Sequence, residues 1–328
     1  MMRNIVAAAA VALGLAAVPA KAAEEINFGI ISTESSSNLK VIFEPWLKAM
    51  EEETGLKVNA FFASDYAGII EGMRFNKVQV AWFGNKSAME AVDRAEGEVF
   101  AQTVPNDGEP GYYSHIIVNT DSPYQKLEDI LKCDQSLNFG IGDPNSTSGF
   151  LVPTTFIFSA KNIDPKKCFK TVRNANHQAN ALATANKLVD AAANNSENLT
   201  RIEKTHPEAR KKIRVIWTSP LIPSDPLVWR KDLDEATKKK VADFIFGYGK
   251  SGNAEADAKA IAILDALEWA PFKKSDNRQL LPIRQMEVNK AMAKIASDES
   301  LSAEEKKAKL DELKAKAAEI EKQIGAKS

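Results

Sequence analysis

The chain has 328 residues, of which 43 are Lys or Arg and 44 are Asp or Glu, so its formal net charge at pH 7 is −1. This near balance offers no basic footprint for nucleic acid or for an anionic membrane surface. A chain of roughly 300 residues exceeds what one hydrophobic core usually organises, so we expect two lobes.

The first 22 residues have the pattern of a secretory signal peptide. Arg3 precedes the apolar run IVAAAAVALGLAAVPA, and Ala20, Lys21 and Ala22 fit the A-x-A cleavage pattern. The apolar run is too short to span a bilayer comfortably, and no cysteine stands at the cleavage site to take a lipid. We expect cleavage near Ala22 and an exported chain of formal charge −3, because cleavage removes Arg3 and Lys21 and no acidic residue.

From Ile26 onward, short β-branched or aromatic runs alternate with amphipathic segments, which is typical of an α/β fold with mostly parallel sheets flanked by helices. The first series contains the predicted strands INFGII, KVNAFFA, VQVAWFG and VFAQTV and the predicted helices NLKVIFEPWLKAMEEETG, DYAGIIEGMRFN and NKSAMEAVDRAEG. A second series follows the turn at Asp121. Its predicted strands are LNFGIG, FKTVRNA and DAAANN, and its helices are LEDILK, SGFLVPTTFIFSAKN, HQANALATANKLV and ENLTRIEKTHPEARKK.

Extended segments near residues 119 and 222 indicate that two crossing strands join the lobes. We expect residues 23–118 and 225–285 to form lobe 1, residues 119–224 to form lobe 2, and residues 286–328 to form C-terminal helices. Ligands of open α/β sheets bind beyond the carboxyl ends of the strands. Two lobes that face each other with those ends would enclose a cleft.

The C-terminal tail is rich in Lys, Glu and Ala, which favours a helix. Its apolar residues Leu310, Leu313, Ala317, Ile320 and Ile324 alternate at spacings of three and four. This seam is narrower than the stripe of a helix that lies on a globular core, and it favours pairing with another chain. The alternative is a charged helix that docks on its own lobe.

Cys133 and Cys168 precede two consecutive predicted strands, LNFGIG and FKTVRNA. If those strands are adjacent and parallel, both thiols lie at one edge of the sheet, away from the cleft. In an oxidising compartment we expect a disulfide there, and the alternative is two small buried hydrophobic side chains. The three histidines are far apart and no metal-binding motif occurs, so we expect no metal or cofactor.

Residues 142–149, GDPNSTSG, crowd three hydroxyl groups against the start of an apolar helix. One of Ser146, Thr147 and Ser148 suffices as an N-cap. Three hydroxyls with the backbone N–H groups of a helix N-terminus instead suit an anion. The sequence alone leaves both interpretations open.

Other polar residues stand at neighbouring strand-to-helix turns. His177 and Tyr66 each begin a predicted helix, and either Tyr112 or Tyr113 would point from a crossing strand into the cleft. All are hydrogen-bond donors, although each also has an ordinary role as a packing or turn residue.

Two acidic residues add acceptors to this set. Glu197 lies in a first helical turn behind a predicted Ser196 cap, and Asp225 lies on the second crossing segment. Both types are also common at helix starts and turns. A ligand with a phosphate-like group at one end and an ammonium group at the other would satisfy donors and acceptors together.

Several stretches resemble the periplasmic phosphonate-binding proteins of bacterial importers. They are INFGIISTESSSNLK, VNAFFASDYAGIIEGMRFNKVQVAWFGNKSAMEAVDRA, AQTVPNDGEPGYYS, GDPNSTSGFLVP, HQANALATANKLVDAAANNSENL and SPLIPSDPLVWRKDL, with WAPF and LLPIRQM extending the likeness to about residue 287. The resemblance implies a two-lobed fold of the type II-like periplasmic binding proteins. It also implies a non-enzymatic role: capture of phosphonates, notably 2-aminoethylphosphonate, and delivery to the membrane permease of an ATP-driven (ABC) importer.

The same resemblance assigns residues to the ligand. It implies that the phosphonate oxygens are held by Tyr66, Tyr112, Ser146, Thr147, Ser148 and His177, and it selects Tyr112 over Tyr113. Glu197 and Asp225 would hold the amino group. Similar proteins pair through C-terminal helices, which would make this chain a homodimer in the periplasm.

Two other functions compete with this interpretation. Related subfamilies bind phosphite or methylphosphonate, so the chain could be a binder of another oxyanion, including phosphate. A secreted hydrolase with a Ser, His and Glu triad is disfavoured, because the chain has no G-x-S-x-G elbow and no metal set for phosphoryl chemistry.

Overall fold

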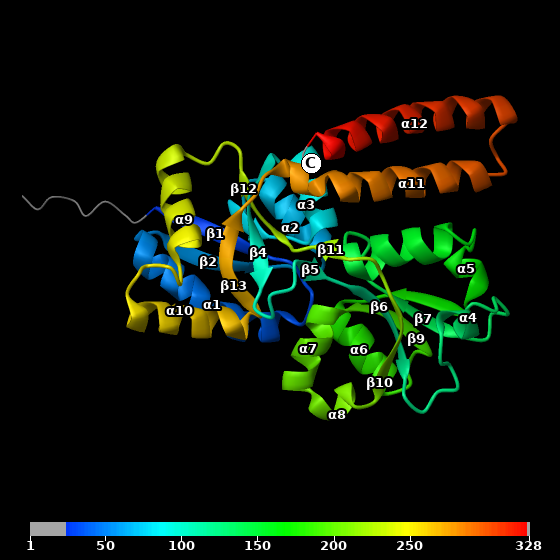
Figure 1. The fold of residues 1–328 in the computed structure, drawn as a ribbon, viewed down its shortest axis with the longest axis horizontal. Helices are drawn as coiled ribbons and strands as arrows, with labels where there is room; N and C mark the ends of the chain where they lie inside the picture. The colour runs from blue at the N-terminus through cyan, green and yellow to red at the C-terminus, as the bar shows by residue number, and fades with distance from the viewer. Residues whose placement is uncertain (1–23, 327–328) are drawn as a thin grey trace, which may run out of the picture.

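The computed structural model describes residues 24–326, which form two β-sheets covered by helices (Figure 1). A two-stranded ribbon lies between the sheets, and a helical hairpin at the C-terminus runs alongside them. The predicted signal peptide, residues 1–22, lies outside the described residues. None of the helices between residues 24 and 326 is both long and apolar enough to cross a lipid bilayer.

The first sheet has the strand order β13-β4-β12-β3-β1-β2. Its strands are β1 (Glu25–Ile30), β2 (Lys57–Phe62), β3 (Val80–Trp82), β4 (Gly97–Pro105), β12 (Pro226–Arg230) and β13 (Trp269–Lys274). The helices of this lobe are α1 (Ser36–Thr54), α2 (Tyr66–Arg74), α3 (Asn85–Arg94), α9 (Glu235–Gly247) and α10 (Ala254–Ala266). A cluster of aromatic rings centred on the buried Trp46 packs helices α1 and α9 against β1 and β13.

The second sheet has the strand order β10-β6-β9-β7-β8. Its strands are β6 (Ser114–Asn119), β7 (Asn138–Ile141), β8 (Thr171–Asn174), β9 (Ala191–Asn195) and β10 (Ile213–Thr218). Its helices are α4 (Leu127–Ile130), the π-helical turns η1 (Thr147–Leu151) and η2 (Thr154–Ser159), α5 (Pro165–Cys168), α6 (His177–Ala185), α7 (Ser196–Thr205) and α8 (Pro207–Arg210). Cys133 and Cys168 form a disulfide at the edge where β7 and β8 begin.

Two segments cross between the sheets, and their short strands β5 (Gly111–Tyr112) and β11 (Ile222–Pro223) pair with each other. The first crossing lies earlier than the predicted boundary at residue 118, because β6 already pairs with β9 and β10 of the second sheet. The sheets are also mixed rather than mostly parallel. A strand that arrives from the other lobe runs against its new neighbours, as β6 does beside β9 and β12 does beside β3.

The C-terminal segment begins with η3 (Asn277–Leu280) and continues as a hairpin of α11 (Leu281–Ser297) and α12 (Ala303–Gly325) (Figure 1). Along the predicted seam, Ala317 and Ile320 are buried and Leu313 is half-buried against α11 of the same chain, whereas Ile324 is exposed. Docking within the chain therefore accounts for much of the seam. Helix α11 also packs across the crossing region, where its Met286 contacts the cluster of Tyr112, Val152 and Ile222.

Candidate functional site

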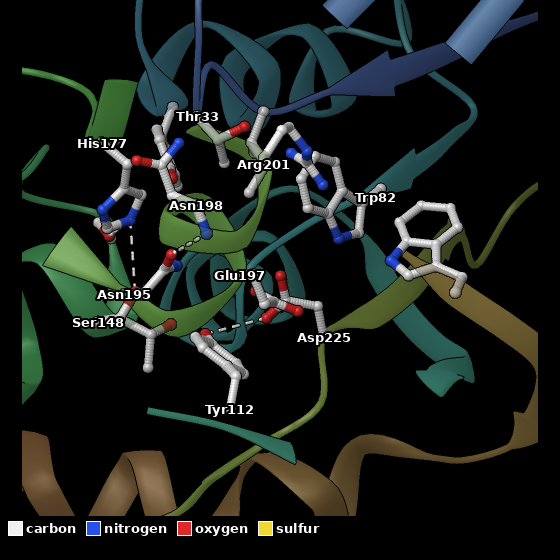
Figure 2. A pocket seen from close by; sticks show the side chains of 16 residues that line it. Thr33, Trp82, Tyr112, Ser148, His177, Asn195, Glu197, Asn198, Arg201 and Asp225 are labelled. Atoms are coloured by element: carbon white, nitrogen blue, oxygen red, sulfur yellow. Dashed lines mark hydrogen bonds between the residues drawn. The ribbon is translucent and has the colours of Figure 1, made fainter. Parts of the chain in front are cut away.

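A cavity of about 30 Å³ lies between the two lobes, and its small volume indicates that they lie close together. All eight residues predicted to bind ligand line it: Tyr66, Tyr112, Ser146, Thr147, Ser148, His177, Glu197 and Asp225 (Figure 2). These residues come from strand-to-helix turns of both sheets and from the crossing segments. The fold thus brings together positions that are 159 residues apart in the sequence.

The turn between β7 and η1 is built by close backbone contact. Gly142 N–H donates to the Gly149 carbonyl at 2.8 Å, and a Cβ atom at Gly142 would lie 2.6 Å from the Gly149 backbone. Ser146 is the N-cap, since its Oγ accepts from Gly149 N–H at 3.0 Å. The cap and the anion interpretations are therefore compatible, because one hydroxyl caps and all three residues line the cavity.

His177 completes this cluster from the first turn of α6. Its Nε2 lies 3.4 Å from Ser146 Oγ and 3.3 Å from Ser148 Oγ. Burial lowers the pKa of His177 to about 4, so the ring is neutral at pH 7. Asn195 Nδ2 donates to Ser148 Oγ at 3.1 Å, which leaves that hydroxyl proton free to point toward an acceptor. The cluster can donate several hydrogen bonds to an anion without carrying a charge of its own.

Two hydrogen bonds join the lobes beside this cluster. Lys86 N–H at the start of α3 donates to Thr147 Oγ1 at 2.9 Å. Tyr66 N–H at the start of α2 donates to the carboxylate of Asp143 at 3.2 Å. The first turns of two helices of the first lobe therefore meet the hydroxyl turn of the second lobe across the cavity.

The acidic end of the cavity contains Glu197 and Asp225, whose carboxyl groups project together in Figure 2. Tyr112 O–H donates to Asp225 Oδ1 at 3.1 Å, and Asn85 Nδ2 lies 3.5 Å from the same oxygen. Burial and then the neighbouring Glu197 raise the pKa of Asp225 well above its ordinary value. Burial also raises the pKa of Glu197 to about 7, against the opposing charge of Arg201. Two acids that resist ionisation side by side would be stabilised by a cation between them.

Two local details differ from, or refine, the sequence-based expectations. The cap of α7 is Asn195 rather than Ser196, because Asn195 Oδ1 accepts from Asn198 N–H at 2.7 Å. Ser196 instead anchors the crossing segment, with its Oγ accepting from Tyr113 N–H at 3.1 Å. Tyr112 lines the cavity and is buried, whereas its half-buried neighbour Tyr113 is not among the lining residues.

Within residues 24–326, no group of three or more His, Cys, Asp and Glu side chains is arranged to hold a metal ion. The donors and acids of the cavity instead suit an organic ligand with an anionic and a cationic end.

Comparison with known proteins identifies the family. The sequence model of the periplasmic substrate-binding proteins of phosphonate ABC transporters matches residues 28–280. The chain belongs to this family. Its members are substrate-binding components of importers, so this phosphonate-binding protein of the periplasm is a transport protein and not an enzyme.

Individual relatives agree with this assignment. The phosphonates-binding periplasmic protein of Escherichia coli K12 is 53% identical over 307 residues, which cover 93% of this chain and 89% of that protein. A structure of a binding-protein component of a phosphonate ABC transporter from Pseudomonas aeruginosa is 54% identical, with a TM-score of 0.89, and the match covers 93% of this chain and 99% of that chain. The predicted two-lobed α/β fold is thereby confirmed.

More distant relatives differ in what their names state. A phosphate-import protein of Mycolicibacterium smegmatis is 32% identical over 209 residues, which cover 61% of this chain and 64% of that protein. A Prochlorococcus marinus protein solved with methylphosphonate has a TM-score of 0.70 at 22% identity, covering 81% of this chain and 99% of that chain, and shares the fold.

Sequence reasoning about this phosphonate-binding protein missed other residues that line the cavity: Ile31, Thr33, Trp82, Gly84, Asn195, Asn198, Arg201 and Trp269. Asn195 and Asn198 could have been predicted as lining residues, because they stand in the same turn as Glu197. The two tryptophans carried no signal, since apolar runs in strands and turns usually mark core packing.

Proposed function

We propose that this phosphonate-binding protein captures 2-aminoethylphosphonate and delivers it to the importer's permease. The observation that carries the proposal is the pair of acids, half-buried Glu197 and buried Asp225, in the same cavity as the uncharged donor cluster around Ser148 and His177. An unsubstituted alkylphosphonate has no cationic end to place between the two carboxylates.

In this assignment the phosphonate oxygens accept hydrogen bonds from Tyr66 and from the hydroxyl turn of residues 146–148, together with His177. The amino group lies between Glu197 and Asp225. The resemblance assigns Tyr112 to the phosphonate oxygens, but we propose that it supports the amino end instead, because its hydroxyl already donates to Asp225. Each charge-assisted hydrogen bond contributes about 1.5–3 kcal/mol, so loss of one acid should weaken binding roughly ten- to hundredfold.

Isothermal titration calorimetry with 2-aminoethylphosphonate, ethylphosphonate, methylphosphonate and phosphate tests the proposal. The first two ligands differ only by the amino group, and we expect the amino-bearing one to bind at least tenfold more tightly. Glu197→Gln and Asp225→Asn should each remove most of that preference. Glu203→Gln is the matched control, because Glu203 is an exposed acid on the same helix. Equal affinity for the two ligands in the unaltered protein contradicts the assignment.

Binding is proposed to proceed by closure of the lobes about the paired crossing strands β5 and β11, with residues 24–113 and 225–285 moving against residues 114–224. Hydrogen bonds such as Lys86 N–H to Thr147 Oγ1 form only when the lobes meet. Small-angle X-ray scattering should therefore detect compaction on addition of ligand, and an unchanged radius of gyration would contradict closure.

Export and dimerisation are also part of the proposal. The sequence pattern around Ala20 and Ala22 supports cleavage near Ala22, which mass spectrometry of the periplasmic protein tests. A homodimer through the C-terminal helices is supported by the family resemblance and by the exposed Ile324 at the end of α12. Light scattering that gives the mass of one chain at micromolar concentration would exclude it.

A further inference from the structure

Arg201 stands on α7 one helical turn after Glu197. A Glu followed four residues later by an Arg on a helix is the spacing at which the two ordinarily attract each other. In the described part of the chain, however, the ion pairs of Arg201 within 4.0 Å are made with Glu34 and Glu268. Both partners belong to the other lobe.

The contacts hold the guanidinium group firmly on that side. Arg201 Nη1 donates to Glu34 Oε1 at 2.9 Å. Its Nη2 lies 3.8 Å from Glu268 Oε2 and 3.5 Å from the Leu267 carbonyl oxygen, and Lys204 Nζ approaches Glu268 Oε1 at 3.4 Å. The side chains of Glu34 and Glu268 are only 2% and 8% exposed. Glu34 follows β1, and Glu268 precedes β13, so two separate loops of the first lobe converge on one arginine.

This arrangement matters because Arg201 also lines the cavity, with Glu197 and Asp225 (Figure 2). A guanidinium group paired directly with Glu197 would neutralise that carboxylate and repel a second cation. The ligand's ammonium group would then meet one acid instead of two. The pairing that local helix geometry favours is therefore the one that would weaken amino recognition.

We propose that Glu34 and Glu268 are specificity-determining residues, which hold Arg201 on the first lobe and so leave Glu197 to the ammonium group of the ligand. This inference rests on the proposed function, because it presumes that Glu197 binds an amino group. It assigns Arg201 the role of a positioning residue whose orientation decides whether the ammonium group meets one acid or two.

The inference also couples the amino site to lobe closure. Glu34 and Glu268 reach Arg201 only when the lobes meet, because they lie on a different lobe from α7. Closure therefore completes the contacts that hold Arg201 on the first lobe.

The experiment compares 2-aminoethylphosphonate with ethylphosphonate by calorimetry in Glu34→Gln. This substitution keeps the size of the side chain but removes the strongest partner of Arg201. We expect Arg201 to turn to Glu197, so that the preference for the amino-bearing ligand falls about tenfold, whereas ethylphosphonate binding changes less. Glu268→Gln should also reduce the preference for the amino-bearing ligand, but by a smaller factor, because the carboxylate oxygen of Glu268 lies farther from Arg201 than that of Glu34. Glu203→Gln, on the exposed side of α7, should change neither ligand.

The decisive variant is Glu34→Gln combined with Arg201→Met. Methionine keeps an unbranched apolar stem without a charge that could occupy Glu197, so the preference for the amino-bearing ligand should return. A role of Glu34 in structure alone predicts no such rescue. If circular dichroism shows that Glu34→Gln does not fold, the same test can be made at Glu268. It then compares the single variant Glu268→Gln with the double variant Glu268→Gln and Arg201→Met.

Equal weakening of both ligands in Glu34→Gln, or absence of rescue in the double variant, overturns the inference. Its failure is distinguishable from failure of the proposed function. If the unaltered protein does not prefer 2-aminoethylphosphonate over ethylphosphonate, the proposed ligand is wrong. If it does, and Glu34→Gln keeps the full preference, the ligand stands and only the role of Glu34 is wrong.

Discussion

Replacing Glu197 by Gln should stabilise the ligand-free protein, and more so at high pH. Burial raises the pKa of Glu197 from 4.5 to about 7 in the folded state. Because the folded protein holds this proton more tightly than the unfolded chain, its stability falls as the pH rises from about 4.5 through 7. Above pH 7, in the absence of a cation, the charged carboxylate therefore destabilises the folded protein, and Gln removes this destabilisation.

The expected size follows from the same shift. Linkage gives a destabilisation of about 3 kcal/mol at pH 8 and less than about 1 kcal/mol at pH 5. Glu197 keeps some surface toward the cavity, so screening reduces the pH 8 effect to about 1–2 kcal/mol. For a protein of this size that corresponds to an increase in melting temperature of about 1.5–3 °C.

Differential scanning fluorimetry between pH 5 and pH 8 measures this increase. Glu203→Gln serves as the control for loss of an acid on α7. Saturating 2-aminoethylphosphonate should reverse the order at pH 8, because only the unaltered protein gains the full binding energy. A melting temperature for Glu197→Gln at pH 8 that does not exceed that of the unaltered protein, or a larger gain at pH 5 than at pH 8, would refute the reasoning.

Three further predictions concern the same cavity and the disulfide. The affinity for 2-aminoethylphosphonate, relative to that for ethylphosphonate, should rise as the pH increases through 7, because Glu197 must lose its proton to hold the ammonium group. Calorimetry that finds a pH-independent ratio of the two affinities would argue against this. Tyr112→Phe should weaken the amino-bearing ligand about threefold to tenfold and ethylphosphonate less, since the hydroxyl supports Asp225; equal losses for both ligands in a titration would count against that role. Replacing Cys133 and Cys168 by Ser should lower the free energy of unfolding by about 2–4 kcal/mol without changing the calorimetric affinity, because the disulfide lies outside the cavity; thiols that titrate freely in the unfolded oxidised protein would exclude the bond.

Much of the site was predictable because its residues stand at strand-to-helix turns. The hydroxyls of residues 146–148 follow a strand, and His177 and Tyr66 each begin a helix. The order of strands and helices along the chain was enough to direct such turns toward one cleft. The family resemblance then distinguished Tyr112 from Tyr113, which strand alternation alone had left undecided.

What could not be predicted depends on contacts between distant segments. Helix geometry pairs Glu197 with Arg201, and nothing in the sequence indicates that Glu34 lies closer to that arginine. The sheet that β6 joins was equally hidden, since an extended segment that leaves one lobe and enters another has no residue that marks the transition. The cap of α7 was ambiguous for a simpler reason, because Asn195 and Ser196 are both good capping residues.

The backbone contact between Gly142 and Gly149 determines which side chains around the cavity can be exchanged. Those of the turn that the two glycines form cannot, whereas others can. A side chain at Gly142 would collide with the backbone of Gly149, and one at Gly149 would come within 2.9 Å of Ser146 Oγ and 3.1 Å of His177 Cε1. Any added carbon there distorts the group of atoms that we propose to receive the anion. Engineering of this protein toward other phosphonates should therefore leave the turn unchanged and vary the acids and their neighbours, where side chains rather than backbone atoms determine the shape of the cavity.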